Sequence, residues 1–386
     1  MLCAGLTCVL AVLAAADPAV GQAYHRGAGA TGGSVLRQAI AELVAMPGGP
    51  PGVAVTVQVG SSRSFYAGGV AALGGRAPRI GDQMRVASVA KAFSGATALV
   101  LVNRGVLHLR DTIGRWLPYL PARWHRVTLR ELLEHTSGIP DFSRSAKFLA
   151  AVRRSPTKAP GPRTLLSYAG SKLNFPPGSR YHYSNSDNVV VGLMIQAATR
   201  RSYARVLTRA VLRPLGLSHT TLPVRTHLDR PFIHGYALDR KTETPREDVS
   251  QVVAAGWAWA SGGVVSTPAD LNRFIRGYVG GRLISAKLRA RWQRLFMPAS
   301  GSEPPGPGFN SAGMALFRYQ TRRGTVYGHS GNTLGYTQYA FSSRDGSRSA
   351  TVSINVQVTQ HSRNQQRRVF LGLRRVARAA ICQALR

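Results

Sequence analysis

The alternation of apolar and polar residues divides the chain into two strand-rich regions with a long helical region between them. Residues 35–45, VLRQAIAELVA, have apolar residues at helical spacing. PGVAVTVQVGSSRSFYAGGVAAL alternates with period two around a Gly-Ser turn, which predicts a β-hairpin. From Ser88 to about residue 240 the pattern is mainly helical. Further strands are expected in WAWASGGVVS, SAGMALFRYQ, TVYGHSG, YTQYAFSS and SATVSINVQV, followed by a basic helix at 361–383.

This order of elements predicts one sheet that begins near the N-terminus and is completed near the C-terminus. We therefore expect an α/β fold in which an antiparallel sheet is flanked by N- and C-terminal helices and carries an inserted, mainly helical subdomain. The sheet subdomain would span about 34–87 and 241–386, and the helical subdomain about 88–240. The Pro- and Gly-rich MPASGSEPPGPGF indicates a long surface loop between strands.

The first residues have the pattern of an export signal. In MLCAGLTCVLAVLAAADPAVGQAYHRG an apolar run is followed by small residues that would suit cleavage after Ala16 or Ala23. We predict a signal peptide at 1–23 and a hydrolase domain at 24–386 that is secreted or associated with the cell wall, with no membrane span after cleavage. An uncleaved anchor is the alternative, although the run is shorter than the roughly 20 apolar residues that span a bilayer.

Composition adds a strong positive charge and argues against metal chemistry. The chain has 50 Lys and Arg against 16 Asp and Glu, a formal net charge of +34, which would attract anionic cell-wall polymers. No block of five or six consecutive basic residues forms a binding tail, so we expect a solvated basic surface and no specific nucleic-acid partner. After cleavage Cys382 would be the single cysteine, and the histidines lack metal-ligand spacing. We predict no metal and no cofactor.

Candidate chemistry begins with Ser88 and Lys91 in RVASVAKAFSG. Residues three apart share one face of a helix, and a serine hydroxyl needs an adjacent base before it can attack a carbonyl. Lysine can be that base when burial lowers its pKa. Ser155 and Lys158 in SPTK have the same spacing, but their Pro-flanked loop would not hold them in place. Taken alone, Ser88 and Lys91 fit a helix cap and a surface lysine equally well.

Two further motifs follow in order along the chain. Tyr183-Ser184-Asn185 precedes a predicted helix, and His329-Ser330-Gly331 lies between strand-like runs. The ordered set S-x-x-K, S-D-N and K-T-G marks penicillin-binding proteins and class A β-lactamases. With the flanking segments VTLRELLEHTSGIPDF, PPGSRYHYSNSDNVVVG and WASGGVVSTPADL, the chain resembles the serine β-lactamase-like superfamily in its class C and low-molecular-weight penicillin-binding branch. Within that branch it is most similar to secreted actinomycete D-alanyl-D-alanine carboxypeptidases.

The resemblance implies a role for each motif residue. Ser88 would be the acylated nucleophile and Lys91 its base, while Tyr183 would relay protons and Asn185 would hold Lys91 and the substrate amide. His329 stands where many relatives have lysine, and it would orient Tyr183 or add positive potential. The backbone N–H groups of Ser88 and Asn332 would form the oxyanion hole. His135 in HTSG is expected to support a turn and is not a predicted base.

The resemblance also implies a substrate. Trp257 would line the cleft, Ser330, Gly331 and Asn332 would form its edge, and Arg318 would bind a C-terminal carboxylate from a position about two residues later than the family's arginine, which falls opposite Leu316. The expected activity is that of a secreted serine D-alanyl-D-alanine carboxypeptidase or transpeptidase that acts on peptidoglycan stem peptides and is acylated by penicillins. An esterase or β-lactamase of the same fold is the enzymatic alternative, and a non-catalytic penicillin-binding cell-wall protein is the other.

Overall fold

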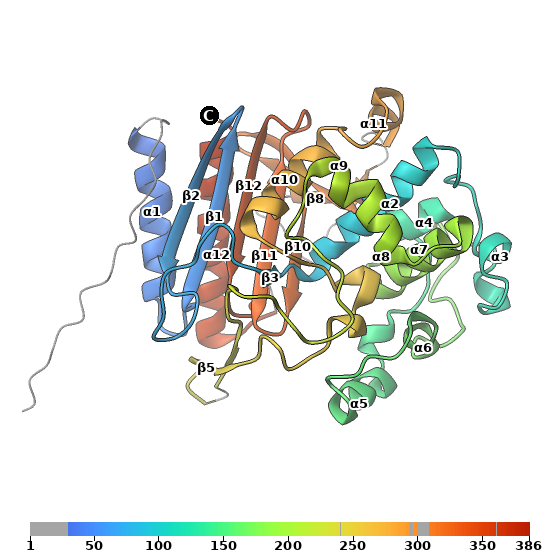
Figure 1. Ribbon diagram of the computed structural model, residues 1–386, viewed down its shortest axis with the longest axis horizontal. Coiled ribbons are helices and arrows are strands. Elements are labelled where there is room, and N and C mark those ends of the chain that lie inside the picture. Colours follow the sequence, from blue (N-terminus) through green and yellow to red (C-terminus); the bar gives the residue numbers. More distant parts are fainter. Residues whose placement is uncertain (1–29, 240, 293–295, 300–308, 360) are drawn as a thin grey trace, which may run out of the picture.

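The computed structural model describes residues 30–239, 241–292, 296–299, 309–359 and 361–386 (Figure 1). The predicted signal peptide at 1–23 and most of the predicted Pro- and Gly-rich loop lie outside these residues.

An antiparallel sheet of eight strands forms the centre of the molecule. Its strand order is β2-β1-β12-β11-β10-β9-β8-β7. The bounds of the strands are β1 (Gly52–Val59), β2 (Ser62–Gly69), β7 (Met297–Pro298), β8 (Phe309–Gly313), β9 (Leu316–Thr321), β10 (Gly324–Thr333), β11 (Tyr336–Ser342) and β12 (Arg348–Ile354). The predicted hairpin forms β1 and β2, and β1 pairs on its other side with β12, near the C-terminus. The predicted fold class is confirmed.

Helices cover both faces of this sheet. α1 (Ala30–Ala45) and α12 (Asn364–Ala384) pack together on one face, and α10 (Pro268–Val279) packs on the other (Figure 1). The alternation along β1 follows from this arrangement: Val53 and Val55 belong to the core under α1 and α12, whereas Ala54 belongs to the core under α10.

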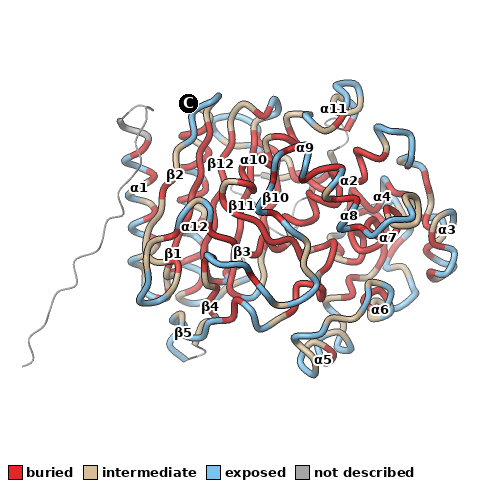
Figure 2. Tube along the Cα trace, viewed as in Figure 1, coloured by how far each residue is buried: buried red, intermediate tan, exposed pale blue. Residues whose placement is uncertain are grey.

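The helical part is built around α2 (Ala90–Asn103), which lies beside α7 (Asn185–Thr199). All residues from Ala90 to Leu101 are buried, which explains why the sequence of α2 is apolar on every side (Figure 2). The other helices are α3 (Ile113–Trp116), α4 (Leu129–Glu134), α5 (Ala146–Arg154), α6 (Pro162–Ser167), α8 (Tyr203–Leu207), α9 (Arg213–Leu215) and α11 (Ala286–Trp292).

The strand predicted in WAWASGGVVS is wrong for all but its last two residues, which form β6 (Val265–Ser266). The segment forms two 3₁₀ turns, η5 (Ala255–Trp257) and η6 (Trp259–Ser261), before the two-residue strand β6 pairs with β3 (Met84–Arg85). Trp257 and Trp259 alternate because both rings are buried in the core, and the backbone between them is not pleated. Periodicity over so few residues does not distinguish a strand from consecutive turns.

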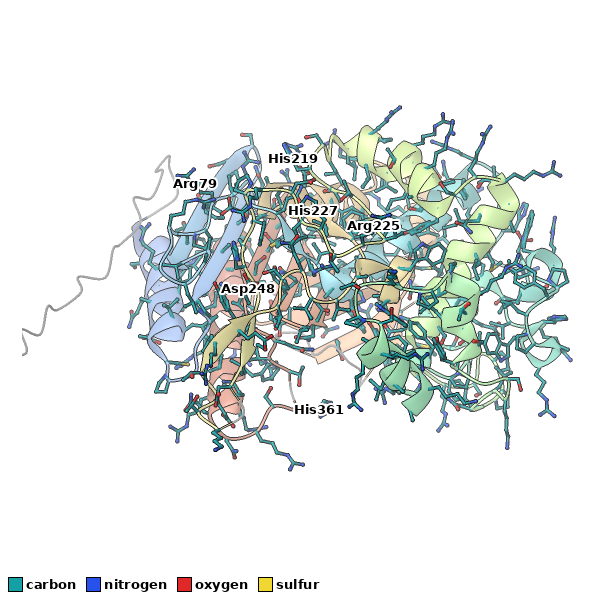
Figure 3. The ribbon with its side chains drawn as sticks, turned by 60° about the horizontal axis from the view of Figure 1, so that its bottom comes forward. Arg79, His219, Arg225, His227, Asp248 and His361 are labelled. Carbon is teal, nitrogen blue, oxygen red and sulfur yellow. The ribbon has the colours of Figure 1, made fainter. Side chains whose placement is uncertain are left out.

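An irregular segment connects α9 to β4 (Tyr236–Leu238), which pairs with β5 (Pro245–Asp248). The labelled His219, Arg225 and His227 mark its course in Figure 3, with Asp248 of β5 nearby. The carbonyl of Arg225 accepts a hydrogen bond from Ala255 N at 3.0 Å, so this segment supports η5.

Candidate active site

Ser88 lies in a 3₁₀ turn, η1 (Ala87–Val89), immediately before α2. The preceding residue, Ala87, has a φ of +51°, a left-handed conformation that non-glycine residues adopt at a cost of about 1 kcal/mol or more. On the other side, β10 passes very close: a Cβ on Gly331 would lie 2.5 Å from Val86 O and 2.8 Å from Ser88 N. Glycine at 331 therefore allows the β10 backbone to run against the Ser88 N–H.

Lys91 is fully buried and its amine faces three oxygens. Nζ lies 3.1 Å from Ser88 Oγ, 2.7 Å from Asn185 Oδ1 and 2.7 Å from Ser261 O. A neutral amine has two hydrogens and one lone pair, and the amide and carbonyl oxygens can only accept. In the neutral state the two hydrogens are therefore donated to Asn185 and Ser261, and the lone pair faces the Ser88 hydroxyl.

Burial makes that neutral state accessible. Removal of the ammonium from water lowers the pKa of Lys91 from 10.5 to about 7, against the opposing charges of Asp141 and Asp187. A base whose pKa lies near the working pH combines a substantial unprotonated fraction with useful basicity. Lys91 thus has the position and the pKa of a general base for Ser88.

Asn185 is held in one orientation by its neighbours. Its Nδ2 donates to Asp141 Oδ2 at 3.0 Å and to Ser143 Oγ at 2.9 Å, which leaves Oδ1 for Lys91. Both amide hydrogens are used, so in this structure Asn185 holds Lys91 but has no hydrogen left for the predicted bond to a substrate amide.

A second hydrogen bond joins the two helices that carry these groups. One turn beyond the Lys91–Asn185 contact, Asn188 Nδ2 of α7 donates to Ser94 Oγ of α2 at 2.8 Å, and both groups are buried. This bond fixes the relative position of α2 and α7, and with it the distance between Lys91 and Asn185.

Tyr183 lies beside the Lys91 amine. Nζ is 4.8 Å from the centre of the Tyr183 ring, and the rings of His135 and His329 lie 4.7 Å and 6.4 Å from it, centre to centre. The structure therefore brings Ser88, Lys91, Tyr183, Asn185 and His329 together, as the motifs predict.

His329 is a buried, neutral imidazole. It packs against Phe317 with ring centres 5.0 Å apart, and Nδ1 donates to the carbonyl of Ser330. Burial, with a smaller contribution from the charge of Lys91, holds the pKa of His329 well below 6.5. The side chain is placed to orient Tyr183, but the alternative role predicted for it, that of a positive charge, requires an imidazolium that this environment disfavours.

We expect His329→Gln to leave the pH dependence of activity between pH 6 and 8 unchanged, since a neutral histidine does not titrate there. The rate of acylation should fall less than about a hundredfold, the lower end of general acid–base effects. A pH–rate profile of kcat/KM checks this. If wild-type activity declines as pH rises through 6–8 and the variant lacks that decline, His329 acts as the imidazolium.

Three neighbouring residues of β10 contribute mainly through their backbone. Ser330 is fully buried, and the Asn332 side chain accepts a hydrogen bond from Thr337 Oγ1 at 3.0 Å. Because Gly331 abuts Ser88 N, the backbone of residues 331–332 borders the nucleophile, where the second oxyanion donor is expected. The assignment of that donor to Asn332 N remains a prediction.

Trp257 and Arg318, two predicted substrate-binding residues, are engaged elsewhere. The Trp257 side chain is buried, and its Nε1 donates to the carbonyls of Ser155 and Pro156 at 3.2 and 3.1 Å, so it anchors the chain after α5. Arg318 pairs with Tyr327, about 13 Å along β10 from Gly331. Its Nε donates to Ser311 of β8 at 3.1 Å, on the side of β9 away from β10.

Several residues of the site were not predicted. The backbone carbonyl of Ser261 could not be predicted from the sequence, because every residue has such a carbonyl. Asp141 and Asp187 are more informative: they belong to HTSGIPDF and SNSDN, and a carboxylate within an otherwise small or apolar segment is unusual in a chain with 16 acidic residues. His135, expected only to support a turn, also bonds to Asp187 and packs on Tyr183.

Two further findings concern the described residues alone. Within them, no group of three His, Cys, Asp or Glu side chains is arranged to hold a metal ion. In the same part of the chain, no helix is both long and apolar enough to cross a membrane.

Comparison with known proteins gives related sequences. Penicillin-binding protein 4* of Bacillus subtilis (strain 168) is 28% identical over 268 residues, which cover 65% of this chain and 56% of that protein. Protein flp of Staphylococcus aureus (strain COL) is 28% identical over 195 residues, which cover 50% of this chain and 37% of that protein. The chain thus matches only about half or less of the length of these curated relatives.

Solved structures share the fold over most of the chain. The D-stereospecific amidohydrolase from a Streptomyces species matches with a TM-score of 0.74 and 27% identity, over 84% of this chain and 94% of that one. The D-amino acid amidase from Ochrobactrum anthropi SV3, complexed with L-phenylalanine amide, matches with a TM-score of 0.77 and 23% identity, over 91% and 98%. The β-lactamase family profile matches residues 36–373. The chain therefore belongs to the β-lactamase family.

Proposed function

We propose that this protein is a serine hydrolase that forms an acyl-enzyme on Ser88 and cleaves amide or peptide bonds next to a D-configured residue. The observation that carries the proposal is the Lys91 amine, buried 3.1 Å from Ser88 Oγ with its two hydrogens held by Asn185 and Ser261. A nucleophile beside a base that is itself oriented by further groups is the arrangement that covalent catalysis requires.

The proposed reaction proceeds in two stages. Lys91 accepts the Ser88 proton while Oγ forms a bond to the substrate carbonyl carbon, and backbone N–H groups beside Gly331 stabilise the oxyanion. Lys91 passes the Ser88 proton to Tyr183 as Tyr183 gives its own proton to the leaving amine and the carbon–nitrogen bond breaks. Water then attacks the acyl-enzyme, gives its proton to the same relay, and releases Ser88 and the carboxylic acid product.

The expected charge of the leaving group, the part of the substrate that is released when the bond breaks, changes once the surroundings of Arg318 are considered. A D-alanyl-D-alanine carboxypeptidase needs a cation directed at a free carboxylate, and Arg318 was the candidate. At the level of His329, β9 has Leu316, because Gly328 pairs with Phe317. With Leu316 apolar, His329 neutral and Arg318 directed toward β8, these three positions favour a substrate whose leaving group is uncharged, such as an amide.

The similar proteins support both versions of the reaction. The resemblance to penicillin-binding protein 4* supports a peptidoglycan peptide and acylation by penicillins, and the resemblance to the D-stereospecific amidohydrolase, at 27% identity, supports an amide. We retain D-alanyl-D-alanine carboxypeptidase activity as the second candidate. β-Lactamase or esterase activity is tested with the same protein.

The deciding experiment compares matched substrates. We expect kcat/KM for an N-acetylated D-Ala-D-Ala amide to exceed that for the corresponding free acid by about tenfold, because a carboxylate that is bound without a cationic partner loses hydration and the neutral amide avoids that cost. A preference for the acid supports the carboxypeptidase instead. A neutral ester and the chromogenic β-lactam nitrocefin are measured in parallel. Covalent labelling of Ser88 by fluorescent penicillin would exclude a protein that only binds penicillin.

Arg318→Ala provides a second check on the leaving end. Because the guanidinium bonds to Ser311 and lies 5.5 Å above the Phe296 ring centre, we expect kcat/KM to change less than about threefold for both the acid and the amide. A loss of tenfold or more that is confined to the acid restores Arg318 as the carboxylate ligand.

Export remains part of the proposal. The apolar run within residues 1–23 supports secretion, and the charge of +34 supports retention by anionic cell-wall polymers. N-terminal sequencing of the protein recovered outside the cell checks the cleavage site, and release from isolated walls by salt checks the electrostatic binding.

A further inference from the structure

The turn formed by residues 135–138 takes no part in the proposed reaction. It is hydrogen-bonded to the chain on both sides of Tyr183. The carbonyl of His135 accepts a hydrogen bond from His182 N at 2.8 Å, directly before Tyr183. Beyond Tyr183, Asp187 of α7 receives two bonds, from His135 Nδ1 at 2.8 Å and from Ser137 Oγ at 2.5 Å. The turn therefore fixes the backbone that carries Tyr183 through both of its ends.

The protonation of this pair follows from its surroundings. His135 and Asp187 are almost completely buried, and burial raises the pKa of Asp187 well above its usual range, so the contact between His135 Nδ1 and Asp187 Oδ2 is a hydrogen bond that shares one proton. Burial, with the charge of Lys91, lowers the pKa of His135 to about 3. His135 is thus a neutral ring whose Nδ1 is held by Asp187 and whose other nitrogen, Nε2, faces away from that bond.

The second ring nitrogen is costly, whichever way the proton is placed. His135 Nε2 is buried and has no hydrogen-bond partner among the described residues. A buried unpaired polar atom costs about 1–3 kcal/mol, which an apolar ring in the same place would avoid. The backbone adds to the cost, because His135 has the left-handed conformation with φ of +56°. Such costs in a native structure are typical of positions that serve function.

The His135 ring is in direct contact with the ring of the proton relay. Its centre lies 4.7 Å from that of Tyr183, with the two planes inclined at 39°, and the same Tyr183 ring lies 4.8 Å from Lys91 Nζ. Asp187 prevents rotation of the imidazole, and the imidazole in turn limits where the phenol ring can lie. A displacement of about 1 Å in a catalytic group costs as much as about a hundredfold in rate.

We propose that His135, fixed by Asp187, is a positioning residue for Tyr183 and thereby sets the rate at which a proton reaches the leaving nitrogen during acylation of Ser88. The proposal rests on the proposed function only in that Tyr183 relays protons. It does not depend on which substrate the enzyme prefers.

Two substitutions separate the two contacts of His135. In His135→Asn the amide can still donate to Asp187 and tolerates the left-handed backbone, but the ring against Tyr183 is lost. In His135→Phe the ring is kept and the bond to Asp187 is lost. We expect a fall in the Ser88 acylation rate of about tenfold to a hundredfold in each, with KM for the best substrate within about twofold of wild type. His125→Asn, outside the site, is the matched control and should leave the rate unchanged.

The decisive measurement repeats both substitutions in a Tyr183→Phe background. If His135 acts through the Tyr183 hydroxyl, its substitution should cost less than about twofold there, because coupled residues are strongly non-additive. An equal fold-loss in both backgrounds overturns the proposal and makes His135 structural. So does an unchanged rate in both His135 variants.

The readout is chosen to be independent of the substrate. A fluorophosphonate forms an Oγ–phosphorus bond and releases fluoride, which leaves without a proton, so its labelling rate reports the Ser88–Lys91 pair alone and should change less than about twofold in the His135 variants. Penicillin acylation breaks a carbon–nitrogen bond and should show the full loss. An equal loss with both probes makes His135 structural. Absence of amide and peptide turnover with intact, Tyr183-dependent acylation by penicillin would refute the proposed substrate class and leave the positioning role standing. Should the melting temperature of both His135 variants collapse, Ser137→Ala is used: it removes one bond to Asp187, and we expect a loss of about threefold that disappears in the Tyr183→Phe background.

Discussion

Replacement of Ser88 by alanine is expected to abolish covalent labelling by penicillin and to reduce hydrolysis by about 10⁶-fold, as in other enzymes whose nucleophilic serine is removed. The Ser88 hydroxyl is the atom that would bond to the substrate, and no other hydroxyl faces Lys91 Nζ in the contacts described above. Mass spectrometry of the penicillin-treated protein measures the adduct, and thermal unfolding confirms that the variant is folded.

A matched control exists in the same chain. Ser155 and Lys158 repeat the Ser-x-x-Lys spacing, but Ser155 Oγ bonds to the carbonyl of Lys158 at 3.3 Å, and the Lys158 side chain is exposed. Ser155→Ala should therefore be labelled at the wild-type rate. Labelling of Ser88→Ala at that rate would disprove the assignment of the nucleophile.

Replacement of Lys91 by methionine is expected to lower the acylation rate by about 10²- to 10⁴-fold, the usual contribution of a general base. In the wild type, the base is the neutral amine, which is populated above its pKa. Since that pKa is about 7, kcat/KM should fall as pH decreases through 7 and reach a plateau above it. The variant should lack this fall in kcat/KM below pH 7, and pH–rate profiles of both proteins measure the difference.

The same lowered pKa predicts an effect on stability. In the unfolded chain Lys91 titrates near 10.5 and in the fold near 7, so between these values the unfolded state binds more protons. The Lys91 contribution to the free energy of unfolding is therefore least favourable below pH 7 and improves as pH rises toward 10.5. Denaturant unfolding of wild type and Lys91→Met is measured at pH 7 and at pH 9. Between these pH values the free energy of unfolding should rise more for the wild type than for the variant. A wild-type gain equal to that of the variant would mean that Lys91 is not buried as a neutral amine.

The sequence predicted the sheet and its helices well where the pattern was long. The 3.6-residue period of α1 and α12 and the alternation in β1 and β2 are direct consequences of one buried face. It failed over the first part of WAWASGGVVS, because two buried tryptophans two residues apart have the same spacing in consecutive turns as in a strand. Tertiary packing placed those rings in the core. Trp257 was predicted to line the cleft, and in the structure its Nε1 donates a hydrogen bond to the carbonyl of Ser155.

By itself the sequence determined the fold class and the order of the three motifs, because each depends on residue types at short fixed spacings. It also contained Ser88 and Lys91, whose helical spacing alone brings them within reach of each other. Only the tertiary structure decided that the pKa of Lys91 is lowered to about 7, since burial comes from segments distant in the chain. It likewise decided that His329 is uncharged, that Arg318 lies beside Ser311, and that His135 and Asp187 support Tyr183. Charge and contact at a site depend on what surrounds a side chain, which residue spacing does not specify.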